Sequence, residues 1–232
     1  MFEIFVMGFL LGMRHAMDSD HLAAVASLVS KTVSLRESVR LGSAWGLGHT
    51  ITLLLLGSTV LLLDKLIPEQ MALMLEFAVG VMLLALGLDV LRRLRKEKVH
   101  IHPHRHANGT IHIHAHAHIR SEQQEHQHQH ISSFPVRALL VGVMHGLAGT
   151  AAVMILTLQS VQSFSTGLLY IVLFGFGSIL GMAILSMVIA VPLRRTAQSH
   201  AKYYPFLQGT IASATILLGL NIMASIGLMG VF

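Results

Sequence analysis

Apolar and polar positions divide the chain into six long hydrophobic stretches separated by polar segments. A helix needs about 20 apolar residues to cross the hydrocarbon core of a bilayer, and each stretch has that length. We therefore expect an all-α integral membrane protein whose six transmembrane helices lie near residues 3–29, 41–63, 71–91, 135–158, 167–191 and 206–230. The first stretch lacks the basic start and the small-residue cleavage site of a signal peptide, so we expect it to be retained as a helix.

Short motifs recur between the two halves of the chain. Segments 12–15, 45–49 and 86–89 resemble segments 142–145, 174–178 and 218–221, in the same order and at one offset of about 130 residues. A duplicated unit of three helices enters the membrane with its second copy upside down, which is the inverted repeat of many secondary transporters. The predicted organisation is a first three-helix repeat over 1–91, a disordered loop over 92–134 and a second repeat over 135–232.

Charge is scarce and unevenly placed. Charged residues make up 12% of the 232 residues, hydrophobic residues 53%, and the net charge is +5. Lys and Arg gather after the first, third and fifth stretches, which by the positive-inside rule face the cytoplasm, with both termini outside. The basic balance therefore indicates a multi-pass topology in the plasma or inner membrane and no nucleic-acid partner. Asp89, at a helix end beside Arg92 and Arg93, is read as an interfacial charge pair. The absence of cysteine excludes disulfides, thiolate metal sites and cysteine nucleophiles.

The first stretch carries ionisable side chains at membrane depth, where they are costly and are read first as functional. On a continuous helix, His15, Asp18 and His21 lie on successive turns within an arc of about 120°, and Asp20 points elsewhere. Two imidazoles and a carboxylate suit Ni²⁺, Co²⁺ or Zn²⁺. Three roles are possible for Asp20: it forms a salt bridge, it caps a helix at a break, or it orients a ligand histidine.

Three histidines from different stretches are expected at one depth. Counting 1.5 Å per residue from the cytoplasmic ends of their helices places His21, His49 and His145 roughly 12–15 Å deep, near the middle of a core of roughly 30 Å. The three spans can therefore converge on one metal site, with His15 two turns further out. The competing interpretation is that each histidine only bonds a neighbouring helix, and it is weakest for the group in the first stretch.

The loop between the halves contains a second kind of histidine pattern. In an extended chain alternate residues share one face, and tracts of this kind bind transition metals through neutral imidazole. We expect the loop to bind metal as a buffer, a sensor or a feeder, the alternative being a plain solvated linker. The histidines concerned are His100, His102, His104, His106, His112, His114, His116, His118, His126, His128 and His130.

Three motifs resemble a known family. The segment His15-Ala16-Met17-Asp18-Ser19-Asp20-His21 is similar to the His-Ala-x-Asp-x-Asp-His signature of the nickel/cobalt transporter (NiCoT, NicO-like) superfamily. The segment 47–50, Leu-Gly-His-Thr, resembles that family's second motif, and the segment 145–150 resembles its shorter, UreH-like branch of urease accessory permeases. The resemblance implies a permease for nickel, with cobalt as a second candidate, whose transport site consists of His15, Asp18, His21 and His49, with His145 and Asp20 secondary. It implies no organic cofactor, and the partners are the lipid bilayer and either a second copy of the chain or urease-maturation metallochaperones.

The second half departs from the first at the site. Ala148 and Thr150 stand where the first half has Asp18 and Asp20, so we expect an asymmetric site built mainly from the first half. The expected function is uptake that supplies nickel to enzymes such as urease, and efflux by the same fold is the alternative. A membrane-embedded metalloenzyme is a remote alternative, because few histidines lie in the spans and no serine beside a base stands out.

Overall fold

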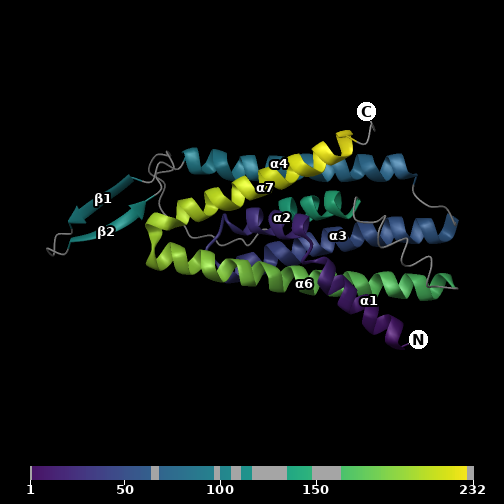
Figure 1. Cartoon of the computed structure of the whole chain (residues 1–232). Helices are drawn as coiled ribbons and strands as arrows, with labels where there is room; N and C mark the ends of the chain where they lie inside the picture. The colour runs from purple at the N-terminus through teal and green to yellow at the C-terminus, as the bar shows by residue number, and fades with distance from the viewer. Residues whose placement is uncertain are drawn as a thin grey trace.

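The computed structural model describes residues 2–63, 68–96, 100–105, 111–116, 135–147 and 163–228. Figure 1 shows the long helices side by side, with two strands beyond one end of the bundle. In chain order the elements are α1 (Phe2–His15), α2 (Ser19–Val29), α3 (Leu35–Leu63), α4 (Glu69–Lys96), β1 (His100–Arg105), β2 (Ile111–His116), a helix over Val136–Leu147, α6 (Phe164–Ser199), the short 3-10 helix η1 (Ala201–Tyr203) and α7 (Tyr204–Leu228).

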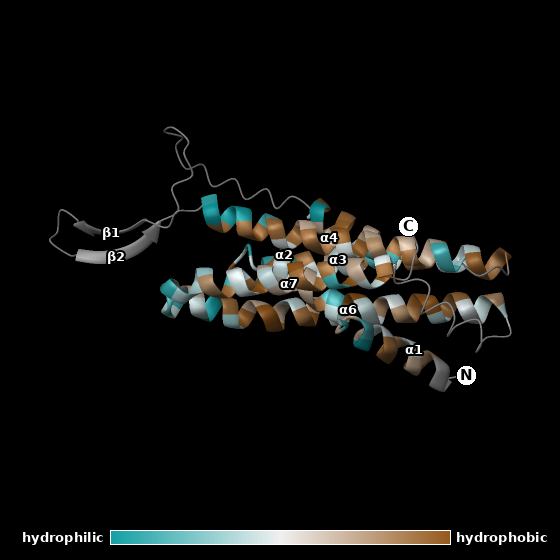
Figure 2. Ribbon diagram, turned by 45° about the horizontal axis from the view of Figure 1, so that its top comes forward, coloured by the Kyte–Doolittle hydropathy of each residue, from teal (hydrophilic) through white to brown (hydrophobic). Residues whose placement is uncertain are grey.

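Four helices in the described part of the chain are long and apolar enough to cross a membrane. They are α3, α4, α6 and the segment Ala201–Leu228, which joins η1 to α7. These helices match the predicted spans 41–63, 71–91, 167–191 and 206–230, and over the described residues each of the four is confirmed as an apolar helix of sufficient length. Figure 2 shows them coloured mostly as hydrophobic, with hydrophilic residues concentrated at the end near the strands. Of the predicted span 135–158, the helix Val136–Leu147 is described and the remainder lies outside the described residues.

The first predicted span is not one helix, which corrects the expectation for residues 3–29. α1 has 14 residues and α2 has 11, so neither reaches the length of about 20 that a crossing needs. A turn joins them, in which the amide of Met17 donates to the carbonyl of Arg14 and the amide of Asp18 donates to that of His15. Asp18 takes the N-cap position of α2 with an extended backbone, a position that aspartate favours. The polar run in this stretch therefore ends one helix and begins another.

The long helices pack in two antiparallel pairs. α3 lies along α6, and α4 lies along α7 (Figure 1). Contacts between α3 and α6 run in opposite chain directions, since Gly46 lies against Ile179 and Gly57 lies against Ile171. The contacts between α4 and α7 reverse in the same way. α1 packs along α6, and α2 contacts α7, α6 and α4, so the broken first segment is held mainly by the second half of the chain.

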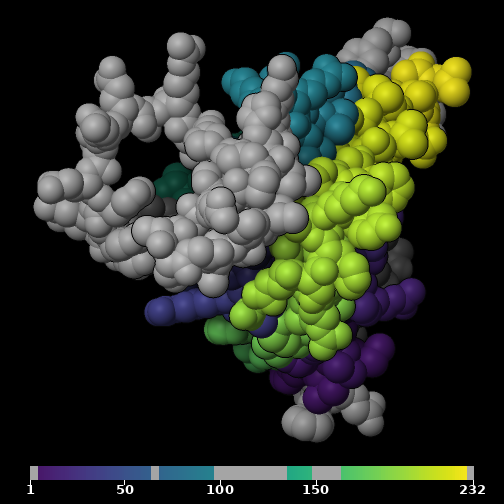
Figure 3. Space-filling model, turned by 90° about the vertical axis from the view of Figure 1, so that its left-hand side faces the viewer, coloured from purple at the N-terminus to yellow at the C-terminus, as the bar shows by residue number. Residues whose placement is uncertain are grey.

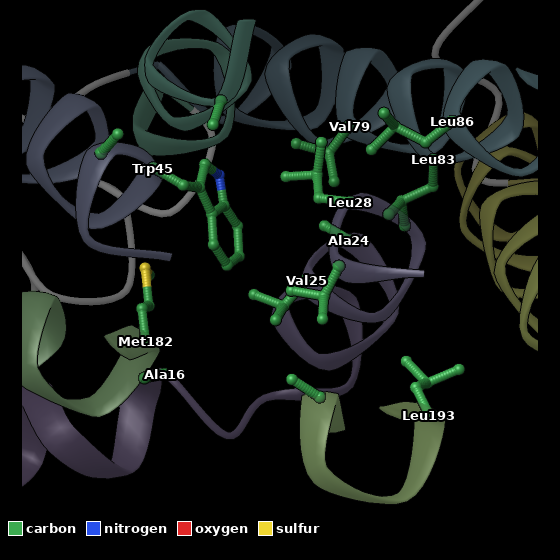
Figure 4. Packing of buried hydrophobic residues seen from close by; sticks show 14 residues of the cluster. Ala16, Ala24, Val25, Leu28, Trp45, Val79, Leu83, Leu86, Met182 and Leu193 are labelled. Carbon is green, nitrogen blue, oxygen red and sulfur yellow. The ribbon is translucent and has the colours of Figure 1, made fainter. Parts of the chain in front are cut away.

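Residues from both halves share one buried core. The main cluster includes Ala16, Trp45 and Leu83 from before the loop and Met182 and Leu193 from after it (Figure 4). All five side chains are at most 1% exposed. The small residues among the helices allow their backbones to approach closely. Helices in a membrane associate through such close packing, because burial of apolar area contributes little to association there.

Close backbone contacts between the halves occur in matching pairs. A Cβ added to Gly12 would overlap the carbonyl oxygen of Phe174, and a Cβ added to Gly142 would overlap the carbonyl oxygen of Trp45. Gly142 and Phe174 occupy the places in the second half that Gly12 and Trp45 occupy in the first. Each contact is therefore the counterpart of the other with the halves exchanged, and both require glycine.

Part of the loop between the halves forms regular structure. β1 and β2 pair antiparallel, with His100 opposite His116 and His104 opposite His112. This differs from the expectation of a disordered loop at these two segments. The reason lies in the sequence, because histidine alternates there with other residues, including β-branched isoleucine, and both features favour extended strands.

Candidate metal centre

Four histidine side chains from four helices meet in the interior of the bundle. His15 ends α1, His21 lies in α2, His49 in α3 and His145 in the helix Val136–Leu147. The ring centroid of His21 lies 4.4 Å from that of His15, 5.2 Å from that of His49 and 4.2 Å from that of His145. His21, His49 and His145 are at most 1% exposed. The structure thus brings together the histidines that helix depth predicts at one level.

The break between α1 and α2 is what brings His15 to His21. On a continuous helix, residues six apart are separated by about 9 Å along the axis and by about 120° around it. The turn over residues 16–18 removes this separation, and the two rings meet edge to face. The interruption of the span therefore builds the site.

Carboxylates hold three of the four imidazoles by one ring nitrogen each. His15 Nδ1 donates to Asp18 Oδ2 at 2.8 Å, and His21 Nδ1 donates to Asp20 Oδ1 at 3.0 Å. Asp20 also accepts from His145 Nε2, at 2.9 Å through its other oxygen. A hydrogen bond to one ring nitrogen fixes the tautomer and points the other nitrogen away as a metal ligand.

The remaining ring nitrogens form a donor set. Among the described residues, no hydrogen-bond partner is found for Nε2 of His15, Nε2 of His21, either ring nitrogen of His49 or Nδ1 of His145, and all are buried. One ligand atom from each of His15, His21 and His49 lies within 4.8 Å of the others. Ligands 2.0–2.1 Å from one ion stand roughly 3.4 Å apart in a tetrahedron, so modest ring rotations would close the set around a cation. Unpaired buried imidazole nitrogens are costly unless they meet such a partner.

Asp20 departs from the position that the helical wheel gives it, whereas Asp18 stays beside His15. Asp20 does not point elsewhere, because the wheel assumes a continuous helix and the chain breaks before it. Its side chain is 29% exposed and joins His21 to His145 across the two halves of the chain. The Asp18 side chain is 54% exposed and touches His15 from outside the cluster. Asp20, His21 and His145 also form a second triad whose ligand atoms lie within 4.8 Å of one another.

Two aromatic side chains flank the histidines. The ring centroid of Trp45 lies 5.3 Å from that of His21 and 5.5 Å from that of His145, and Phe174 lies 5.3 Å from His15. Sequence reasoning on the site considered only ionisable groups and missed both. A signal existed, because Trp45 and Phe174 occupy equivalent places in the two recurring motifs. Both residues are at most 1% exposed, so the cluster has buried apolar neighbours, and such surroundings strengthen electrostatic interactions.

The histidines of the loop stand apart from this centre in the chain. The strand register sets His102 opposite His114, next to the two histidine pairs already described. His106, His118, His126, His128 and His130 lie outside the described residues. Metal binding by the loop stays a prediction.

Comparison with known proteins gives one informative relative. No protein-family model matches the chain, and no solved structure matches it. The chain is 34% identical over 225 residues to the urease accessory protein UreH of Bacillus sp. (strain TB-90), an alignment that covers 97% of this chain and 92% of that protein. The similarity runs through all the elements that carry the histidine cluster.

Proposed function

The chain belongs to the UreH-like branch of the nickel/cobalt transporter superfamily, and from this premise we propose that it is a membrane permease that takes up Ni²⁺, with Co²⁺ as a second cargo, for enzymes such as urease. The observation that carries the proposal is the cluster of four histidines, three of them buried, whose inward ring nitrogens have no protein partner among the described residues. The ion is a substrate here, bound in passing.

The chemistry of the donor set supports a late divalent transition metal as the cargo. Imidazole nitrogen suits Ni²⁺, Co²⁺, Cu²⁺ and Zn²⁺, whereas Mg²⁺, Ca²⁺ and Mn²⁺ favour oxygen ligands. His15, His21, His49 and His145 would bind the ion. In this proposal Asp18 and Asp20 hold the rings and supply negative charge that offsets the charge of the cargo.

We further propose that the two halves are inverted repeats that move against each other. The antiparallel pairing of α3 with α6 and of α4 with α7 supports this, because an axis in the membrane plane reverses the direction of equivalent helices. A second matched pair of contacts, Gly48 with Leu139 and Gly177 with Phe9, supports it as well. The histidines lie at the junction of the halves, where rocking would expose them to one side and then the other.

Uptake is favoured here over efflux because the related accessory protein is named for urease, an enzyme that nickel must reach inside the cell. Efflux by the same fold would use the same site in the opposite direction. A membrane metalloenzyme is the remaining alternative, and bound iron with redox activity in the purified protein would favour it. In the uptake proposal the loop over 92–134 lies in the cytoplasm of a plasma- or inner-membrane protein and hands the ion to metallochaperones. If the cysteine of an Asn108→Cys variant were labelled only from outside intact cells, the cytoplasmic location of the loop would be contradicted.

Accumulation of nickel in cells tests the site. We expect His21→Ala and His49→Ala to reduce uptake to the level of cells without the protein, because each removes a buried ligand. His200→Ala is the matched control, since His200 is exposed in the connection between α6 and η1. Wild-type uptake in both site variants would remove the cluster from transport. If overexpression protected cells from nickel and did not sensitise them, the transport would be efflux and not uptake.

A further inference from the structure

A polar pocket lies at one end of the bundle, away from the histidine cluster. It is bounded by the end of α2, the last turns of α4 and the start of α7, and Ser30, Lys31, Arg93, Tyr204 and Gln208 contribute its polar lining. Figure 3 looks onto this end of the molecule, where α4 in teal and the α6–α7 connection in yellow-green come close together. Tyr204 Oη and Gln208 Nε2 both donate to the carbonyl of Ser30, at 3.0 Å and 2.6 Å, which fixes the wall that α7 provides.

Among the described residues, positive charge is in excess around this pocket. The Asp89 carboxylate accepts from Lys31 Nζ at 2.7 Å and from Arg137 at 2.9 Å, and Arg93 Nε approaches it at 3.5 Å. The expected pairing with Arg93 is therefore present, and Lys31 and Arg137 are partners that the sequence did not indicate. One carboxylate thus faces three cations. Burial lowers the pKa of Lys31, with Asp89 opposing the shift, so a further anion beside it would favour its charged form.

The surroundings of the pocket match the interface between lipid headgroups and hydrocarbon. Tyr203 and Phe206, at the junction of η1 and α7, are 59% and 76% exposed. Exposed aromatic side chains at helix ends mark the headgroup level of a membrane. The same end carries the basic last turn of α4, with Arg95 and Lys96, which the charge pattern assigns to the cytoplasm, where anionic lipids are abundant.

We propose that the pocket binds the phosphate group of an anionic phospholipid, held by Lys31 and Arg93. Both donors line the pocket, and a phosphate would take charge-assisted hydrogen bonds from them while Asp89 keeps them in place. The acyl chains would lie along the exposed apolar surfaces of α4 and α7. The excess of positive charge among the described residues would repel a divalent cation from this pocket.

Lipid binding to the purified full-length protein tests the proposal. The protein is stripped of lipid in mild detergent, and binding of phosphatidylglycerol, of phosphatidylcholine with the same chains and of inorganic phosphate is measured by native mass spectrometry and by the shift in thermal unfolding. The double variant Lys31→Gln/Arg93→Gln removes the two donors. The matched control is Arg92→Gln/Arg95→Gln, which removes the same charge from exposed positions of α4 outside the pocket.

We expect phosphatidylglycerol to bind the wild type more tightly than phosphatidylcholine. The pocket variant should lose at least about tenfold in affinity for phosphatidylglycerol, as two charge-assisted hydrogen bonds are lost, and the control should keep it. Equal losses in the two double variants, or equal binding of both lipids, would overturn the pocket. An equal effect from inorganic phosphate would overturn the lipid as its source. If the double variant does not elute as a single helical species, Arg93→Gln alone, at an exposed position, carries the same test.

Discussion

Replacement of Asp20 by asparagine is the sharpest test of the geometry at the histidine cluster. The carboxylate of Asp20 accepts one hydrogen bond from His21 and one from His145, at 3.0 Å and 2.9 Å, and so orients imidazoles from both halves of the chain. Asp18 accepts one bond, from His15, and is 54% exposed. The two substitutions remove the same charge and keep the same shape, so the comparison isolates the number of rings that each carboxylate holds.

The expected magnitudes follow from those contacts. Loss of a group that orients a metal ligand costs about 10- to 100-fold in metal affinity. Because Asp20→Asn releases two rings, it should lower the affinity for Ni²⁺ by about 100-fold, or about 2.7 kcal/mol. Asp18→Asn releases one ring and should lower that affinity by about tenfold or less, about 1.4 kcal/mol at most. The order is the opposite of the one that a continuous helix gives, in which Asp18 joins the ligands and Asp20 points away.

The emission of Trp45 provides the assay. It is the only tryptophan of the chain, and its ring lies 5.3 Å from His21. Titration at free Ni²⁺ concentrations fixed by a chelator reports the affinity of the buried site, whatever the histidine loop binds. His200→Ala should leave the titration unchanged. An Asp18→Asn variant that weakens binding as much as Asp20→Asn, or an Asp20→Asn variant with wild-type affinity, would refute the reasoning.

Three further results are expected. Ni²⁺ should quench Trp45 emission strongly and Zn²⁺ only weakly, because Zn²⁺ has a filled d shell; equal quenching would indicate a conformational cause. Gly142→Ala should destabilise the protein by about 1–3 kcal/mol in thermal unfolding in detergent, since the new Cβ would overlap the carbonyl of Trp45. Gly209→Ala is the control and should leave stability unchanged, because the nearest atom is a side-chain carbon 3.9 Å away. Thr215→Val should cost about 0.6–1.7 kcal/mol through loss of the buried bond to Ser27 at 2.9 Å that ties α2 to α7, and an unchanged unfolding midpoint would contradict this.

The long helices and the convergence of three histidines could be predicted from the sequence, because both follow from patterns along the chain. Apolar length identifies α3, α4, α6 and α7, and counting residues from basic ends places His21, His49 and His145 at one level. These inferences need only the rise of a helix and the thickness of a bilayer.

The orientation of the carboxylates could not be derived in the same way. A helical wheel predicts the direction of a side chain only within one continuous helix, and α1 ends at His15. Asp18 at an N-cap was a local sign of the break, although the depth argument gave no reason to place it there. The bonds of Asp20 to His145 and of Lys31 to Asp89 join residues 125 and 58 positions apart, and only the packed helices bring such pairs together.

The shared core has a consequence for the order in which the protein is made. α3 packs against α6 and α4 packs against α7, so the first half has all its partners only after the last helix has left the ribosome. About 130 residues separate the end of α4 from the end of α7, and synthesis at roughly 5–20 residues per second takes about 7–26 s. During that time the glycine faces of the first half and its buried histidines stand in the membrane without the surfaces that cover them. A chaperone or insertase that shields them in this interval would raise the yield of folded protein.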